Sequence, residues 1–88
     1  MSWSVYILEC NDGSLYTGIT NDLDKRIQAH ELGRGAKYTR GKGPLNLIYR
    51  EAHKNRSDAS KRESEIKKLS RQEKLALADE NISYLKSD

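Results

Sequence analysis

Residues 4–19 read SVYILECNDGSLYTGI, two strand-like runs joined by Asn11-Asp12-Gly13. Two runs rich in β-branched and aromatic residues, on either side of a short glycine-containing turn, predict a β-hairpin. We expect its strands to span residues 4–10 and 14–20.

The length of the loop decides which side chains share a face, because successive side chains of a strand point to opposite faces of the sheet. A two-residue loop would separate Tyr6 from Tyr16, whereas a three-residue loop would place both on one face. We predict the three-residue loop, because Gly13 can adopt the left-handed conformation that its last position requires. The more apolar side chains then gather on the other face, namely Val5, Ile7, Thr17 and Ile19.

After the hairpin, the sequence predicts a helix that begins at Thr20, Asn21 or Asp22 and ends at Gly33. A third strand follows over residues 45–51. A second helix begins at Ser57 or Ser60 and runs to about residue 69. The capping-box sequence Ser70-Arg71-Gln72-Glu73 opens a third helix, and residues 81–86 add a short turn.

This order of elements, ββαβαα, predicts an α+β fold with a small three-stranded, mostly antiparallel sheet flanked by helices. The length of 88 residues suits one small domain over residues 1–88, and we place its core at about residues 3–78. Cys10 has no second cysteine to pair with, which suits a reducing compartment. No apolar run approaches the roughly 18 residues of a membrane span. We therefore expect a cytoplasmic protein that makes no membrane contact.

The basic residues concentrate in the middle of the chain. Residues 34–74 hold 13 Lys and Arg against 5 Asp and Glu, a local charge of +8 within a net charge of +3. A basic segment between acidic ends predicts a surface that faces a polyanion such as nucleic acid.

Three side chains on the predicted helices are candidates for chemistry. Arg26 and His30 lie four residues apart, so they project from one helical face. Glu63 shares the apolar side of its helix, whereas Glu65 turns toward solvent. A carboxylate in that position calls for a metal, a catalytic task or an ion pair, for which Lys67 is the candidate partner.

Taken together, these motifs resemble the GIY-YIG nucleases. Val5-Tyr6 followed by Tyr16-Thr17-Gly18 resembles the two-part signature of that family. The arginine of its first helix is matched by Arg26, and its glutamate helix by the segment that carries Glu63. The resemblance extends over nearly the whole chain and is greatest to small single-domain bacterial members. Ser4 stands where the family name implies glycine, and Thr17 where it implies isoleucine.

The resemblance implies phosphodiester hydrolysis with one divalent cation, Mg²⁺ or Mn²⁺, held by Glu63. It implies that Arg26 contacts the scissile phosphate, and that Tyr6 and Tyr16 position or deprotonate the attacking water. Tyrosine, with a reference pKa near 10, is a poor base at neutral pH. His30 is therefore a rival general base. We favour Tyr16, or Tyr6 working with it, but the sequence does not rank them against His30.

A glycine-rich basic segment over residues 33–43 predicts contacts with nucleic acid, because flexible backbone and cations suit phosphates and an aromatic ring can stack on a base. Its candidate binding residues are Arg34, Lys37, Tyr38, Arg40 and Lys42.

The leading hypothesis is a metal-dependent endonuclease that acts on DNA, with single-stranded or branched DNA as candidate substrates. Its sequence specificity would be low, a protein partner would supply targeting, and its role would lie in DNA repair or processing. The alternative is a non-catalytic nucleic-acid-binding module that keeps the fold.

Overall fold

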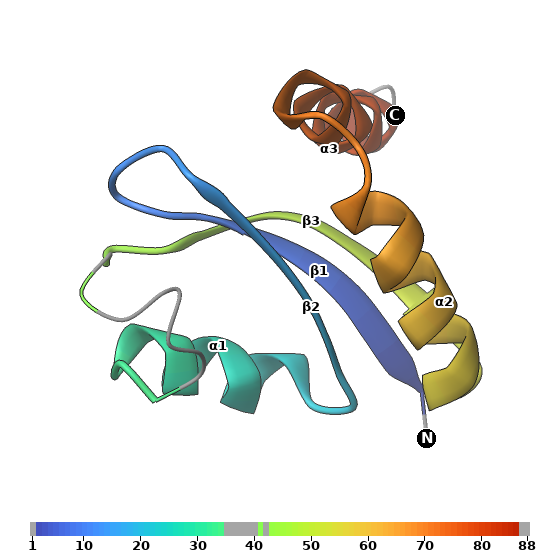
Figure 1. Ribbon diagram of the computed structural model, residues 1–88, viewed down its shortest axis with the longest axis horizontal. Helices are drawn as coiled ribbons and strands as arrows, with labels where there is room; N and C mark the ends of the chain where they lie inside the picture. Colours follow the sequence, from blue (N-terminus) through green and yellow to red (C-terminus); the bar gives the residue numbers. More distant parts are fainter. Residues whose placement is uncertain (1, 35–40, 42, 87–88) are drawn as a thin grey trace.

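The computed structural model describes residues 2–34, 41 and 43–86, with side chains described as far as residue 79. The described residues form three strands and three helices in the order ββαβαα (Figure 1). In chain order these are β1 (Trp3–Glu9), β2 (Leu15–Thr20), α1 (Leu23–Glu31), β3 (Asn46–His53), α2 (Arg56–Lys67) and α3 (Arg71–Lys86). This is the predicted α+β architecture, with strand ends that differ from the prediction by one or two residues.

The three strands form one antiparallel sheet in the order β2-β1-β3. In the β1–β2 hairpin, Tyr6 pairs with Gly18 and Leu8 pairs with Tyr16. Beyond the last pair, the Cys10 amide donates to the Ser14 carbonyl at 2.8 Å, and Gly13 has a φ of +84°. The predicted three-residue loop is therefore confirmed, and both tyrosines lie on the same face of the sheet.

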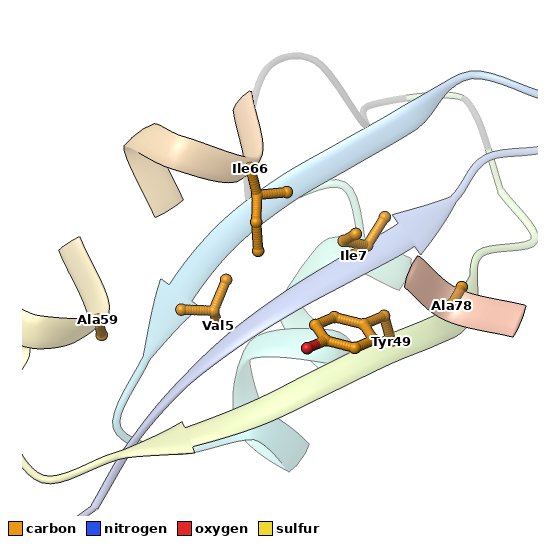
Figure 2. Packing of buried hydrophobic residues seen from close by; sticks show 6 residues of the cluster. All are labelled: Val5, Ile7, Tyr49, Ala59, Ile66 and Ala78. Carbon is orange, nitrogen blue, oxygen red and sulfur yellow. The ribbon is translucent and has the colours of Figure 1, made fainter. Parts of the chain in front are cut away.

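Each face of the sheet is covered by different helices. In Figure 1, α1 lies on one side, and α2 and α3 lie on the other. The α2–α3 side holds a core that Figure 2 shows from close by, in which Ile7 of β1 and Tyr49 of β3 face Ile66 of α2 and Ala78 of α3. The α1 side holds a smaller cluster around Tyr6 and Leu8, against which Leu23 and Ile27 of α1 pack.

The sequence signals for the helix ends are partly confirmed. The Asp22 side chain caps α1, and Gly33, with a φ of +76°, follows its end. The capping box of α3 is present, because the Ser70 amide donates to the Glu73 carboxylate at 2.9 Å and the Glu73 amide donates to Ser70 Oγ at 3.1 Å.

Two predictions about the later helices were wrong. Asn55, and not Ser57 or Ser60, caps α2, because its extended backbone lets its side chain accept from the Asp58 amide at 2.8 Å. Residues 81–86 do not form a separate turn, since they belong to α3, which continues to Lys86.

A polar network joins α2 to β3. Arg62 Nε and His53 Nε2 each lie 2.8 Å from Glu51 Oε1, and the Tyr49 hydroxyl donates to the other carboxylate oxygen. Burial raises the pKa of Tyr49 to about 12, and the Glu51 carboxylate adds to the rise. Because Arg62 precedes Glu63 in α2, this network helps to fix the face of the helix that carries Glu63.

Among the described residues, no helix has the length and apolar content that a membrane crossing requires.

The core on the α2–α3 side should dominate stability. Ile66 is fully buried, so we expect Ile66→Ala to lower the free energy of unfolding by about 2–5 kcal/mol. Leu32 is 64% exposed, and Leu32→Ala should change the same quantity by less than about 0.5 kcal/mol. Urea unfolding followed by circular dichroism measures both, and equal effects would contradict this description of the core.

Candidate active site

Tyr6 and Tyr16 meet above the backbone of Gly18. Tyr6 is fully buried, and the two ring centroids are 6.2 Å apart. A Cβ atom on Gly18 would lie 2.6 Å from the Tyr6 hydroxyl and 3.0 Å from Tyr16 Cε2. Glycine at this position therefore makes room for both phenols. We had assigned Gly18 no role from the sequence, although a glycine inside a strand is a signal of close approach.

Helix α1 brings two more of the predicted residues to the phenols. The Tyr6 hydroxyl lies 2.9 Å from His30 Nε2, and the His30 ring centroid is 5.0 Å from that of Tyr16. Arg26, one helical turn earlier, hydrogen-bonds with both phenols. The prediction that Arg26 and His30 share one helical face is confirmed.

Burial sets the charge states in this cluster. Burial raises the pKa of Tyr6, and hydrogen bonding to Arg26 offsets part of the rise. Burial also lowers the pKa of His30, with a further contribution from the Arg26 charge. At neutral pH the Tyr6 phenol therefore keeps its proton, while His30 is uncharged and has a ring nitrogen that can accept one.

Arg26 keeps one unused donor. Its Nε is buried and has no hydrogen-bond partner among the described residues. A buried donor without a partner costs about 1–3 kcal/mol. A phosphate oxygen could satisfy this donor, because a guanidinium presents paired donors to phosphate.

Glu63 lies on α2, which covers the other side of the sheet from α1. Its side chain is 21% exposed, whereas that of Glu65 is 68% exposed, as predicted. The negative charge of Glu63 contributes to the raised pKa of Tyr6, so the carboxylate acts electrostatically on the phenol. Lys67 Nζ lies 3.4 Å from Glu63 Oε2, which is the ion pair that the sequence offered as one alternative.

The described residues contain no group of three or more His, Cys, Asp or Glu side chains that could enclose a metal ion. Within this part of the chain, at most one further side chain of these types could therefore join Glu63 at a metal ion. This donor set fits Mg²⁺, which is usually bound by one or two carboxylates together with water and phosphate oxygens.

The predicted nucleic-acid-binding segment is only partly described. Arg34 is exposed just after α1, where its amide donates to the Ala29 carbonyl at 2.8 Å. Lys37, Tyr38, Arg40 and Lys42 lie outside the described residues.

Comparison with known proteins gives the family. The model of the GIY-YIG catalytic domain matches residues 2–76, which include both tyrosines, Arg26 and Glu63. The chain belongs to the GIY-YIG family. The domain is similar to a UPF0213 protein of Clostridium perfringens, with 60% identity over 73 residues that cover 83% of this chain and 78% of the relative. A UPF0213 protein of Oceanobacillus iheyensis is 55% identical over 75 residues, 85% of this chain and 87% of the relative.

Two solution NMR structures resemble this GIY-YIG domain. The UPF0213 protein BH0048 of Bacillus halodurans is 48% identical, with a TM-score of 0.53 over 98% of this chain and 86% of that chain. The protein EF2693 of E. faecalis is 38% identical, with a TM-score of 0.62 over 93% of this chain and 88% of that chain. These similarities agree with the α+β fold described above.

The contact above Gly18 should show as an energetic coupling. We expect Gly18→Ala to lower the free energy of unfolding by about 1–3 kcal/mol, because the new methyl group overlaps the Tyr6 hydroxyl. Combined with Tyr6→Phe, which removes that hydroxyl, the substitution should cost less than in the wild type. A double-mutant cycle by urea unfolding measures the coupling.

Gly43→Ala is the matched control, because a Cβ there meets nothing within 4 Å, and it should be nearly neutral. Strict additivity of Gly18→Ala and Tyr6→Phe would contradict the contact.

The burial of His30 predicts a pH dependence of stability. Below about pH 6.5 an unfolded histidine takes up a proton, whereas folded His30, with its lowered pKa, does so only at lower pH. The unfolded state then binds more protons than the folded state. The free energy of unfolding should therefore decrease as the pH is lowered below about 6.5, by up to about 1.4 kcal/mol per pH unit. His30→Gln should remove this fall, and His53→Gln should keep it. Urea unfolding between pH 5 and 8 tests both.

Proposed function

We propose that this GIY-YIG domain is a metal-dependent endonuclease that hydrolyses phosphodiester bonds of DNA. The observation that carries the proposal is the meeting of side chains from β1, β2 and α1 around one fully buried phenol, on which the charge of Glu63 from α2 also acts. Tyr6 contacts His30 at 2.9 Å, hydrogen-bonds with Arg26 and is affected by the charge of Glu63.

Arg26 would bind the scissile phosphate. Cleavage builds negative charge on the phosphate oxygens, and a positioned guanidinium stabilises that charge. The buried Nε that has no partner among the described residues is the donor that a phosphate oxygen would engage. The hydrogen bonds of Arg26 with the two phenols would hold its guanidinium beside the attacking water.

Tyr6 and His30 would form the path for the proton of the attacking water. The phenol gives its proton to His30 Nε2 while it accepts the proton that the water loses, so the phenol ends as it began. This path requires the His30 tautomer that carries its proton on Nδ1. The lowered pKa of His30 keeps its ring uncharged at neutral pH, so Nε2 can accept the proton of the Tyr6 phenol. We therefore assign His30 as the final base, with Tyr6 as the relay and Tyr16 as a positioning side chain.

Glu63 would hold the divalent cation, Mg²⁺ or Mn²⁺, which when bound supplies Lewis-acid stabilisation of the phosphate charge. Because the described residues offer no group of three or more such ligands, most of the ligand positions would fall to water and phosphate oxygens.

The substrate would be chosen with low sequence specificity. The local charge of +8 over residues 34–74 supports binding to the nucleic-acid backbone, which carries no sequence information. We extend the proposal to single-stranded or branched DNA in repair or processing, with targeting supplied by a partner protein in the cytoplasm.

One observation favours the alternative of a non-catalytic binding module. The Glu63–Lys67 contact at 3.4 Å gives the carboxylate a partner in place of a metal. However, an i, i+4 ion pair of this kind is worth only about 0.3–0.5 kcal/mol, so it would yield readily to a divalent cation.

A cleavage assay separates the two readings. With Mg²⁺ or Mn²⁺, we expect the wild type to cleave fluorescently labelled single-stranded or branched DNA. Glu63→Gln should reduce cleavage to background while oligonucleotide affinity stays within about twofold, because the change removes a metal ligand and not a phosphate contact. The matched control is Glu65→Gln on the same helix, which should keep full activity because the Glu65 side chain is 68% exposed.

A wild type that binds these substrates but leaves them intact with either metal would support the binding module. Equal losses in Glu63→Gln and Glu65→Gln would show that Glu63 has no special role.

A further inference from the structure

A groove runs along the outer edge of β2, next to the candidate active site. It consists of two hollows of about 280 and 240 Å³ that share Leu15 and Lys74 as lining residues. Tyr16 lines the first hollow, so the groove begins at a residue of the candidate site. The second hollow continues to Ser14 and Arg71. We call this surface the β2-edge groove.

The β2-edge groove is positively charged. Lys67, Arg71 and Lys74 line it, and none of its described lining residues is acidic. The nearby carboxylates of Glu63 and Glu73 are engaged by Lys67 and by the Ser70 capping box respectively. Arg71 donates one Nη1 bond to the Gly13 carbonyl, which ties α3 to the hairpin turn.

Thr17 adds an unused polar group to the same surface. The residue is only 4% exposed, it lines the first hollow, and its Oγ1 has no hydrogen-bond partner among the described residues. Buried hydroxyl groups normally have a hydrogen-bond partner, because a buried polar group without a hydrogen bond is costly in free energy.

We propose that the β2-edge groove binds backbone phosphates of the nucleic-acid strand that flanks the cleaved bond, through Lys67, Lys74 and the Thr17 hydroxyl. The inference rests on the proposed function, because continuity with Tyr16 is what favours nucleic acid over an acidic protein. Lys67 links Glu63 of the candidate active site to the β2-edge groove, since it pairs with Glu63 and also lines the groove. The groove adds a contact surface to the one predicted for residues 34–42.

Lys74→Ala is the main test, because Lys74 lines both hollows and alanine is favourable in a helix. The probe is a fluorescein-labelled single-stranded DNA of 20 nucleotides, and anisotropy is measured in chelator so that no cleavage occurs. We expect several-fold weaker binding at low salt. The slope of log affinity against log salt should become shallower by about 0.7, the value for one lost phosphate contact on a single strand.

Two variants serve as references. Lys74→Arg should restore both affinity and slope. Lys61→Ala removes an exposed cation of α2 that lines a separate hollow with Ser57 and Ser64, and it should leave both unchanged.

Thr17→Val distinguishes a role of the Thr17 hydroxyl in DNA binding from a purely structural role. It replaces a buried hydroxyl that has no partner among the described residues with a methyl group, so thermal stability should stay the same or rise. DNA affinity should nevertheless fall by about threefold or more, the loss of one hydrogen bond. Unchanged affinity would remove Thr17 from the proposal.

The outcomes distinguish this inference from the proposed function. If Lys74→Ala matches Lys61→Ala in affinity and slope, the groove proposal is wrong even when the wild type cleaves DNA. If Lys74 is required for binding but the wild type does not cleave, the groove stands and the nuclease proposal fails. Polyglutamate of equal charge serves as a competitor beside unlabelled DNA. If it displaces the labelled DNA as strongly as unlabelled DNA does, the proposal that the groove binds nucleic acid is wrong.

Discussion

The candidate site depends on the crossing of Tyr6 over Gly18. The phenol can reach the middle of the site only because the opposite residue of β2 has no side chain, and a Cβ there would lie 2.6 Å from the Tyr6 hydroxyl. This crossing exists in only one hairpin register. The three-residue loop ending in Gly13 supplies that register, and a slip of one residue would turn Tyr16 to the opposite face.

The same short strand serves two purposes. Alternate side chains of β1 point to opposite faces, so Val5 and Ile7 enter the core while Tyr6 enters the site. Helix α2 is held against the core face by the fully buried Ile66 and by the contact of Arg62 with Glu51. A rotation of α2 would break both contacts, so the core and the polar network together fix the direction of Glu63. Stability and site geometry are therefore closely linked in this small protein.

Burial gives the site its chemical character. In water, tyrosine and histidine at neutral pH would be a neutral phenol and a partly protonated imidazole. Burial raises the pKa of Tyr6 against the opposing effect of Arg26, and burial together with the Arg26 charge lowers the pKa of His30, so a protonated phenol lies 2.9 Å from a neutral imidazole. The cationic edge of β2 lies next to this buried centre. In the proposed function, the site would act on one phosphate while the groove holds its neighbours.

The sequence by itself determined the strands, the hairpin register and the helical face shared by Arg26 and His30. These depend on local rules: side-chain alternation, the conformational freedom of Gly13, and helical periodicity. The cap of α2 was misassigned because several polar residues near its start could serve, and the choice of Asn55 depends on where β3 ends.

Only the tertiary structure decided the contacts between distant segments. It placed His30 at the Tyr6 hydroxyl, gave Gly18 its role, and left the Thr17 hydroxyl at the wall of a basic groove. These features depend on how helices far along the chain pack against one hairpin. No local pattern encodes that packing, because each contact joins side chains that the sequence keeps apart.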